Sequence, residues 1–142
     1  MTFRAVTKDD LPLIESLFVD DTSGQVAPPN PTWLEYVTSS ENVYCIVHFD
    51  DNTPIAVTQF DLEDAAASMS VFIREGMRGK GLFSVIIKDA LSVLPTRIRT
   101  VNAYISEANH PSVAAFKRFG FEGALEKDDD GLLIFTFDLT AH

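Results

Sequence analysis

The chain has 142 residues, of which 46% are hydrophobic and 23% are charged, and its formal net charge is −10. This composition predicts one soluble globular domain over residues 1–142, which we expect in the cytoplasm as a monomer or a homodimer. The acidic balance argues against nucleic acid as a partner, and no apolar run approaches the ~20 residues that span a bilayer. The single cysteine, Cys45, cannot form an internal disulfide and reads as a small core residue.

The first part of the chain alternates strand-like and helix-like patterns. Thr7 or Asp9 is expected to cap the first helix, in which Pro12 is tolerated only in the first turn. In order, the expected elements are a strand over residues 3–6, a helix with a stripe of Leu11, Ile14, Leu17 and Phe18, a proline-rich loop over 21–31, a helix over 32–38, and strands over 43–49 and 55–62.

The second part of the chain begins with a strand and a helix that are joined by a glycine loop. Leu82, Val85, Ile86 and later apolar residues recur at helical spacing until Pro95. The expected elements are a strand over residues 68–73, a helix from 82 to 94, a strand over 100–105, a short helix after Asn109, and a strand pair over 122–126 and 132–139 across an acidic turn.

The loop Arg78-Gly79-Lys80-Gly81 lies between that strand and that helix. Glycines let the backbone approach an anion, and the free N–H groups at a helix start bind phosphate. The loop is neither of the two best-known phosphate motifs. Leu82 follows Gly81 where the nucleotide triphosphate loop needs lysine, and Ser84 stands where the dinucleotide fingerprint needs a third glycine.

A second motif lies downstream, where Asn109 opens a short helix and Gly120 closes it before Phe121. Together the two segments resemble the GNAT superfamily of N-acetyltransferases, and the resemblance covers nearly the whole chain. The residues that match the family pattern are Arg78, Gly79 and Gly81 in the loop and Asn109, Ser112, Phe116, Gly120 and Phe121 in the later helix.

The sequence departs from the family pattern at two positions. Gly76 stands where the family usually has glutamine or arginine at the head of the loop. Phe116 stands where many relatives carry the tyrosine that protonates the leaving thiolate, and phenylalanine has no hydroxyl to do so.

The resemblance implies an α/β (α+β) fold in which a mixed, mostly antiparallel sheet of about seven strands is flanked by about four helices. It further implies that two parallel central strands splay apart and that acetyl-CoA lies in the wedge as co-substrate. The residues implied in cofactor binding are Val71, Phe72 and Ile73 through their backbone, Arg78, Gly79, Lys80, Gly81, Leu82, Phe83 and Ser84 around the pyrophosphate, and Asn109, Ser112 and Phe116 on the later helix.

Acetyl transfer to an amine needs a base, because an alkylammonium with a pKa of about 10.4 is almost wholly protonated at pH 7. Glu63, Asp64 and Glu107 are the candidate catalytic carboxylates, with Asp61 beside the first two. His48 and His110 are outside candidates. Tyr104 is a candidate for protonating the thiolate, although strand alternation turns it toward the core, and water is the simpler donor. The histidines have no metal-ligand spacing, so no metal is implied.

Two functions follow from these observations. The favoured one is transfer of an acetyl group from acetyl-CoA to a primary amine. The loop over residues 21–31 and the turn over 128–131, which the resemblance implies at the rim of the acceptor site, are acidic and favour a small cationic molecule over a peptide, with a protein amino terminus as the other possibility. The alternative is an acyl-CoA-binding sensor or interaction domain without transfer activity, since Phe116 replaces the usual acid and no carboxylate is singled out as the base.

Overall fold

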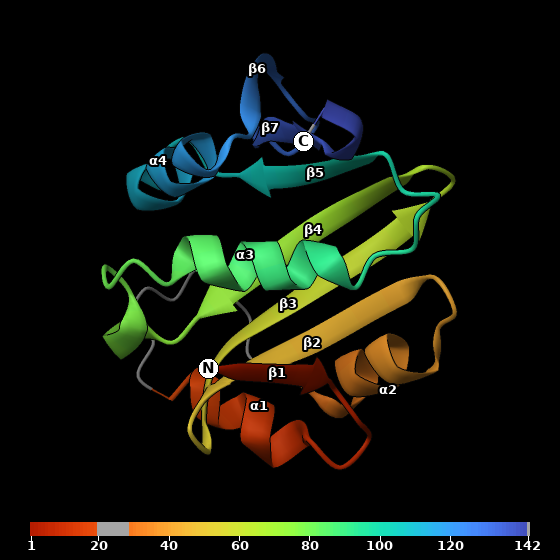
Figure 1. Cartoon of the computed structure of the whole chain (residues 1–142), viewed down its shortest axis with the longest axis vertical. Helices are drawn as coiled ribbons and strands as arrows, with labels where there is room; N and C mark the ends of the chain where they lie inside the picture. The colour runs from red at the N-terminus through yellow and green to blue at the C-terminus, as the bar shows by residue number, and fades with distance from the viewer. Residues whose placement is uncertain (20–28, 142) are drawn as a thin grey trace. The chain divides into compact units, whose positions relative to one another are not determined.

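Four α-helices and seven strands occur in the part of the chain that the computed structural model describes, residues 1–19 and 29–141 (Figure 1). The α-helices are α1 (Leu11–Leu17), α2 (Pro31–Ser39), α3 (Phe83–Ser92) and α4 (His110–Phe119). The strands are β1 (Thr2–Ala5), β2 (Val43–Asp50), β3 (Thr53–Glu63), β4 (Ala66–Ile73), β5 (Thr100–Ile105), β6 (Glu122–Lys127) and β7 (Leu133–Asp138). The loop expected over residues 21–31 lies largely outside the described residues.

The strands form one sheet in the order β1-β2-β3-β4-β5-β7-β6. Its pairs are antiparallel except for β4 and β5, which run parallel from Ala66 opposite Thr100 to Met69 opposite Ala103. This confirms the predicted mixed, mostly antiparallel sheet with two parallel central strands. The splay between those strands stays a prediction.

The chain divides into two compact units, Met1–Gln59 with Val71–Val93 and Phe60–Ser70 with Leu94–His142. The first unit has two clusters of buried apolar side chains, because its strands carry apolar residues on both faces. The larger cluster packs α1 and α2 against the sheet and includes Val6, Ile14, Leu17, Leu34, Val37, Val43, Cys45, Val47, Val57 and Phe72. The smaller one joins Ile55 and Ala56 to Ile86 of α3. Cys45 is therefore a core residue, as predicted.

The start of α1 corrects one expectation. The residue before the helix is Asp10, and neither Thr7 nor Asp9 caps it. The Asp10 carboxylate makes no bond to the helix. It accepts hydrogen bonds from the Thr7 backbone N–H and hydroxyl at 2.7 and 3.0 Å, and two more from the Arg4 guanidinium at 2.7 and 2.9 Å. This buried carboxylate thus joins β1 to the turn before α1, while Pro12 lies in the first turn as expected.

The helix α3 is shorter than its apolar pattern predicted, and its buried stripe is different. The helix begins at Phe83 and ends at Ser92, before Pro95. The predicted core residue Val85 is 45% exposed, whereas its unpredicted neighbour Ile87 is completely buried. A period of 3.6 residues leaves the orientation of a helix uncertain by one residue when apolar side chains occur in runs, and here packing selects Ile86, Ile87 and Ala90.

The second unit holds β5, β7 and β6 with α4, together with the end of β3 and the start of β4; in Figure 1, β5 is teal and α4, β6 and β7 are blue. Its core is aromatic, since the rings of Phe121 and Phe137 lie 5.1 Å apart and Phe135 is 2% exposed. A side chain at Gly123 would meet the Phe135 ring at 2.6 Å, so the aromatic core demands glycine there. The acidic turn between β6 and β7 is closed by the Asp128 carboxylate, which accepts from two backbone N–H groups beyond it.

The Arg4–Asp10 pair generates a prediction about stability and pH. The Arg4 hydrogen bonds lower the pKa of Asp10 from 3.8 to about 2. The ionised carboxylate therefore contributes stability above pH 4, and the contribution is lost as pH falls from 4 toward 2. Because Arg4 is half-exposed, we expect Asp10→Asn to reduce the free energy of unfolding at pH 7 by only on the order of 1 kcal/mol. Urea unfolding at pH 7, 4 and 2.5 is the measurement, with Asp9→Asn as the control. A deficit that does not shrink below pH 4 would contradict the assignment.

Candidate functional site

The end of β4 is held by its side chains on both faces. Phe72 is buried in the cluster beneath α1 and α2, whereas Val71 and Ile73 pack against Ile55 and Ile86. Beyond the strand, the Arg74 N–H donates to the Ile55 carbonyl at 2.7 Å. The three residues predicted to bind the cofactor through their backbone are thus well positioned by packing.

The loop after β4 begins with the short 3-10 helix η1 (Glu75–Met77) and ends at α3. Both predicted glycines have left-handed backbones, with φ of +75° at Gly79 and at Gly81. An added Cβ at either would meet nothing within 4 Å. Glycine is therefore needed for conformation rather than for room, and the space beside the backbone is open to an approaching ligand.

The N-terminus of α3 has backbone N–H groups without acceptors in the helix. The residue before the helix, Leu82, makes no side-chain cap hydrogen bond, and the first bond of the helix runs from the Ile86 N–H to the Leu82 carbonyl at 3.0 Å. The N–H groups of Ser84 and Val85 therefore have no acceptor in the helical ladder. Together with the helix dipole and the exposed side chain of Lys80, they suit a pyrophosphate.

Arg78 is exposed, but its guanidinium is already engaged. Its Nε donates to the Ile73 carbonyl at 2.9 Å, and its Cζ lies 5.1 Å from the centre of the Phe72 ring. The backbone glycines, Lys80 and the start of α3 are thus the groups that face open space, while Arg78 folds back onto β4.

The sequence patterns did not indicate Arg74, which anchors the start of the loop. Its guanidinium donates to the Pro54 carbonyl at 3.1 Å and to the Ser16 carbonyl at 3.0 Å, so it joins β3 to α1. The only signal in the sequence is a basic residue directly after a strand, which also fits a solvated side chain. The three-dimensional contacts alone reveal its role.

The predicted cofactor residues of α4 lie in the second unit. Asn109 caps the helix by accepting a hydrogen bond from the Ser112 N–H at 3.4 Å, and Gly120 ends the helix with φ of +126°. Phe116 is 4% exposed, and its ring packs edge-on against Phe121 at 4.9 Å. The predicted helix and its cap are confirmed, while contacts of these residues with a cofactor stay a prediction.

The candidate carboxylates occupy two separate places along the chain. Glu63 is the exposed last residue of β3, and Asp64 follows in the turn to β4 with φ of +56°. Glu107 follows β5 and lies 2.6 Å from the Lys127 ammonium. The hydrogen bond from Lys127 lowers the pKa of Glu107 below its usual value, so this carboxylate is ionised at neutral pH.

The remaining candidates differ in exposure. His48 is fully buried with its Nε2 3.1 Å from an Asp89 oxygen, and burial lowers its pKa, so the neutral imidazole is favoured. His110 is exposed at the start of α4. The expectation that alternation turns Tyr104 into the core is wrong, because Tyr104 is 42% exposed and its neighbours Ala103 and Ile105 take the core face.

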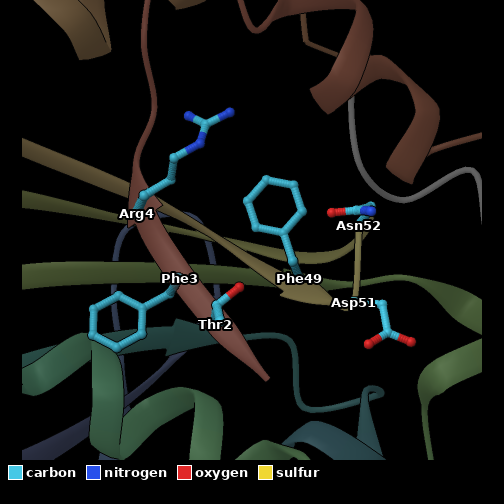
Figure 2. Close-up of a pocket in the computed structure, with 6 residues that line it drawn as sticks. All are labelled: Thr2, Phe3, Arg4, Phe49, Asp51 and Asn52. Atoms are coloured by element: carbon cyan, nitrogen blue, oxygen red, sulfur yellow. The ribbon is translucent and has the colours of Figure 1, made fainter.

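Figure 2 shows a separate open hollow of about 390 Å³ in the first unit. It is lined by Thr2, Phe3, Arg4, Phe49, Asp51 and Asn52. None of the predicted site residues lines it, and the Arg4 guanidinium at its side is committed to Asp10. Among the described residues, no three histidine, cysteine or acidic side chains gather closely enough to hold a metal ion, and no helix is long and apolar enough to cross a membrane.

A mixed sheet with one parallel central pair, a glycine loop and a helix start without a side-chain cap is the arrangement that the family resemblance implied. The model of the Acetyltransferase (GNAT) family matches residues 11–121, and the chain belongs to this family. It is an N-acetyltransferase, and its acetyl donor is acetyl-CoA.

Individual relatives agree with this membership. "Putative phosphinothricin acetyltransferase YwnH" of Bacillus subtilis (strain 168) is 28% identical over 138 residues, which cover 85% of this chain and 83% of YwnH. The GNAT domain of S. lividans PAT is 18% identical with a TM-score of 0.84, over 96% of this chain and 89% of that one. Aminoglycoside acetyltransferase AAC(6')-Ib in complex with coenzyme A is 18% identical with a TM-score of 0.77, over 99% and 95% of the two chains. The two structures are similar in fold.

The loop glycines generate a prediction that needs no ligand. Because non-glycine residues avoid φ near +75°, we expect Gly81→Ala to lower the free energy of unfolding by about 1 kcal/mol. Gly76, in the same loop, has an open surrounding and no left-handed φ. Gly76→Ala is the matched control. It should raise the free energy of unfolding by about 0.5 kcal/mol, because alanine reduces the conformational entropy of the unfolded chain. Chemical denaturation compares the two, and equal effects would contradict the assigned backbone conformations.

Proposed function

We propose that this enzyme transfers the acetyl group of acetyl-CoA to the primary amine of a small cationic molecule. The observation that carries the proposal is the β4–α3 segment, in which two left-handed glycines lead into a helix start without a side-chain cap. The net charge of −10 favours attraction of a cation as acceptor. The names of two relatives contain phosphinothricin and aminoglycoside, and these compounds are small molecules.

We propose that the residues around this segment hold the cofactor as the family resemblance implies. The backbone of Val71, Phe72 and Ile73 follows the part of β4 that pairs with β5, so it suits the amide groups of the pantetheine arm. The loop from Arg78 to Ser84 suits the pyrophosphate. Further contacts are proposed for Asn109, Ser112 and Phe116.

A single domain is part of the same proposal. The family match runs from residue 11 to residue 121 and so includes segments of both compact units. The residues that the family resemblance implies in cofactor binding also come from both units. We therefore propose that residues 1–142 act as one catalytic domain.

Acetyl-CoA supplies an acetyl group activated as a thioester. In the transfer, the amine nitrogen forms a bond to the acetyl carbon, the carbon–sulfur bond breaks, a proton leaves the nitrogen and another reaches the sulfur. A backbone N–H near Ile73 would polarise the carbonyl. With phenylalanine at position 116, we propose that water protonates the thiolate.

We propose Glu107 as the carboxylate that receives the amine proton. It follows β5, which pairs in parallel with β4 and which the family resemblance implies as one side of the acyl-CoA wedge. Glu63 and Asp64 precede β4 and remain the alternatives. The ion pair with Lys127 lowers the pKa of Glu107, so the carboxylate is ionised at neutral pH but is a weaker base than an unpaired glutamate.

The acceptor class is tested by coenzyme A release, measured with a thiol reagent against polyamines, aminoglycosides, amino acids and peptides with free N-termini. We expect turnover with a small cationic amine, and Glu107→Gln to lower kcat/KM for it by about 100-fold, the low end of acid–base contributions. Glu63→Gln and Asp64→Asn are matched controls that also remove one charge. Turnover of peptides alone would contradict the small-molecule acceptor. If only Glu63→Gln or only Asp64→Asn lowers kcat/KM, that residue and not Glu107 is the base.

Cofactor binding is tested by Gly81→Asp, measured by calorimetry with acetyl-CoA. A carboxylate here repels the pyrophosphate and occupies the open space, so we expect affinity to fall by at least about 100-fold, or 2.7 kcal/mol. Gly131→Asp is the matched control, because Gly131 also has a left-handed φ, of +79°, and open surroundings, but lies in the β6–β7 turn. Equal affinity of the two variants would remove the phosphate site from this loop.

A further inference from the structure

We propose that Arg78 is a positioning residue that holds the glycine loop in its binding conformation, through the Ile73 carbonyl and the Phe72 ring. The proposal rests on the proposed cofactor site. It gives Arg78 a different task from that of a phosphate-binding charge, which a basic residue beside such a loop would suggest.

Arg78 closes the chain on itself. Its side chain reaches back five residues to the Ile73 carbonyl at 2.9 Å, and its backbone N–H donates to the Glu75 carbonyl at 3.2 Å. Inside this closure, the Met77 N–H donates to the Arg74 carbonyl at 2.8 Å. The segment between β4 and Gly79 is therefore a compact turn with its exit tied to its entrance.

The ring on which the guanidinium rests is itself held in place. Phe72 is 7% exposed, and Phe18 stacks on it with centroids 4.0 Å apart and planes inclined by 17°. The Arg78 guanidinium carbon lies over the same Phe72 ring, 5.1 Å from its centre. Phe72 is thus held by packing where Arg78 contacts it, and a planar guanidinium stacks on a ring better than an ammonium would.

The glycines of the loop come directly after Arg78 in the chain. Gly79 and Gly81 are the residues with the most conformational freedom to lose. If their entry point is held in advance, less conformational entropy is lost when a ligand binds. Lys80 lies between them and is exposed, so it can supply the mobile charge that Arg78 does not.

Calorimetry with acetyl-CoA separates positioning from charge. Arg78→Ala and Arg78→Lys are both expected to weaken binding about tenfold, since lysine keeps the charge but has no planar guanidinium to stack on the Phe72 ring. Phe72→Leu should have a similar effect, and the double variant Arg78→Ala, Phe72→Leu should bind no more weakly than Arg78→Ala alone. The control is Lys80→Ala, which should reduce the salt dependence of binding. In a double variant with Phe72→Leu, the factors by which the two substitutions weaken affinity should multiply.

Hydrogen exchange of the amides of residues 75–84 without ligand gives a second measurement. Arg78→Ala and Phe72→Leu should speed this exchange, whereas Lys80→Ala should leave it unchanged. If Phe72→Leu does not fold, Phe18→Leu removes the ring that stacks on Phe72 and should act in the same direction.

Wild-type affinity in Arg78→Lys would overturn the positioning role while leaving the cofactor site intact. The same conclusion would follow if the double variant lost affinity by the product of the factors measured for Arg78→Ala and Phe72→Leu. Failure of the wild-type protein to bind acetyl-CoA, or unchanged affinity in Gly81→Asp, would instead overturn the proposed site itself. The two failures are therefore distinguishable.

Discussion

The structure around the candidate site depends on one backbone constraint. The chain must leave β4, pass twice through left-handed φ and begin α3 without a side-chain cap, all between Ile73 and Phe83. Residues with a Cβ avoid such φ values, so glycines are required. Leu82 makes no side-chain cap hydrogen bond, and the N–H groups of Ser84 and Val85 have no acceptor in the helical ladder.

The groups that hold this segment are mostly arginines used as structural donors. Arg74 binds carbonyls of β3 and α1, and Arg78 binds a carbonyl of β4. A guanidinium is suited to this task because it has several donors in a planar arrangement and stacks on aromatic rings. The arginines of the segment, which stand out in a chain of net charge −10, thus serve its architecture.

The missing tyrosine at position 116 has a structural counterpart. The Phe116 ring is buried beside Phe121, within an aromatic core that also includes Phe137. A hydroxyl in such surroundings needs a hydrogen-bond partner, and phenylalanine avoids that need. Phenylalanine itself has no hydroxyl with which to protonate a thiolate.

The sequence by itself determined most strands, the glycine loop and the capped helix after Asn109, because strand alternation, positive φ and helix capping are local requirements with residue signatures. The mixed pairing of the sheet was implied only by the family resemblance. The sequence also determined the family, whose two motifs are local. It could not determine which face of α3 is buried, since adjacent apolar residues fit two orientations and only packing selects Ile87 over Val85. Nor could it show that Asp10 binds Arg4, or that Arg74 and Arg78 fold back onto carbonyls. Those contacts join residues on different elements or across a turn, and the tertiary structure decided them because a charged side chain's partner depends on which donors and acceptors folding brings near it.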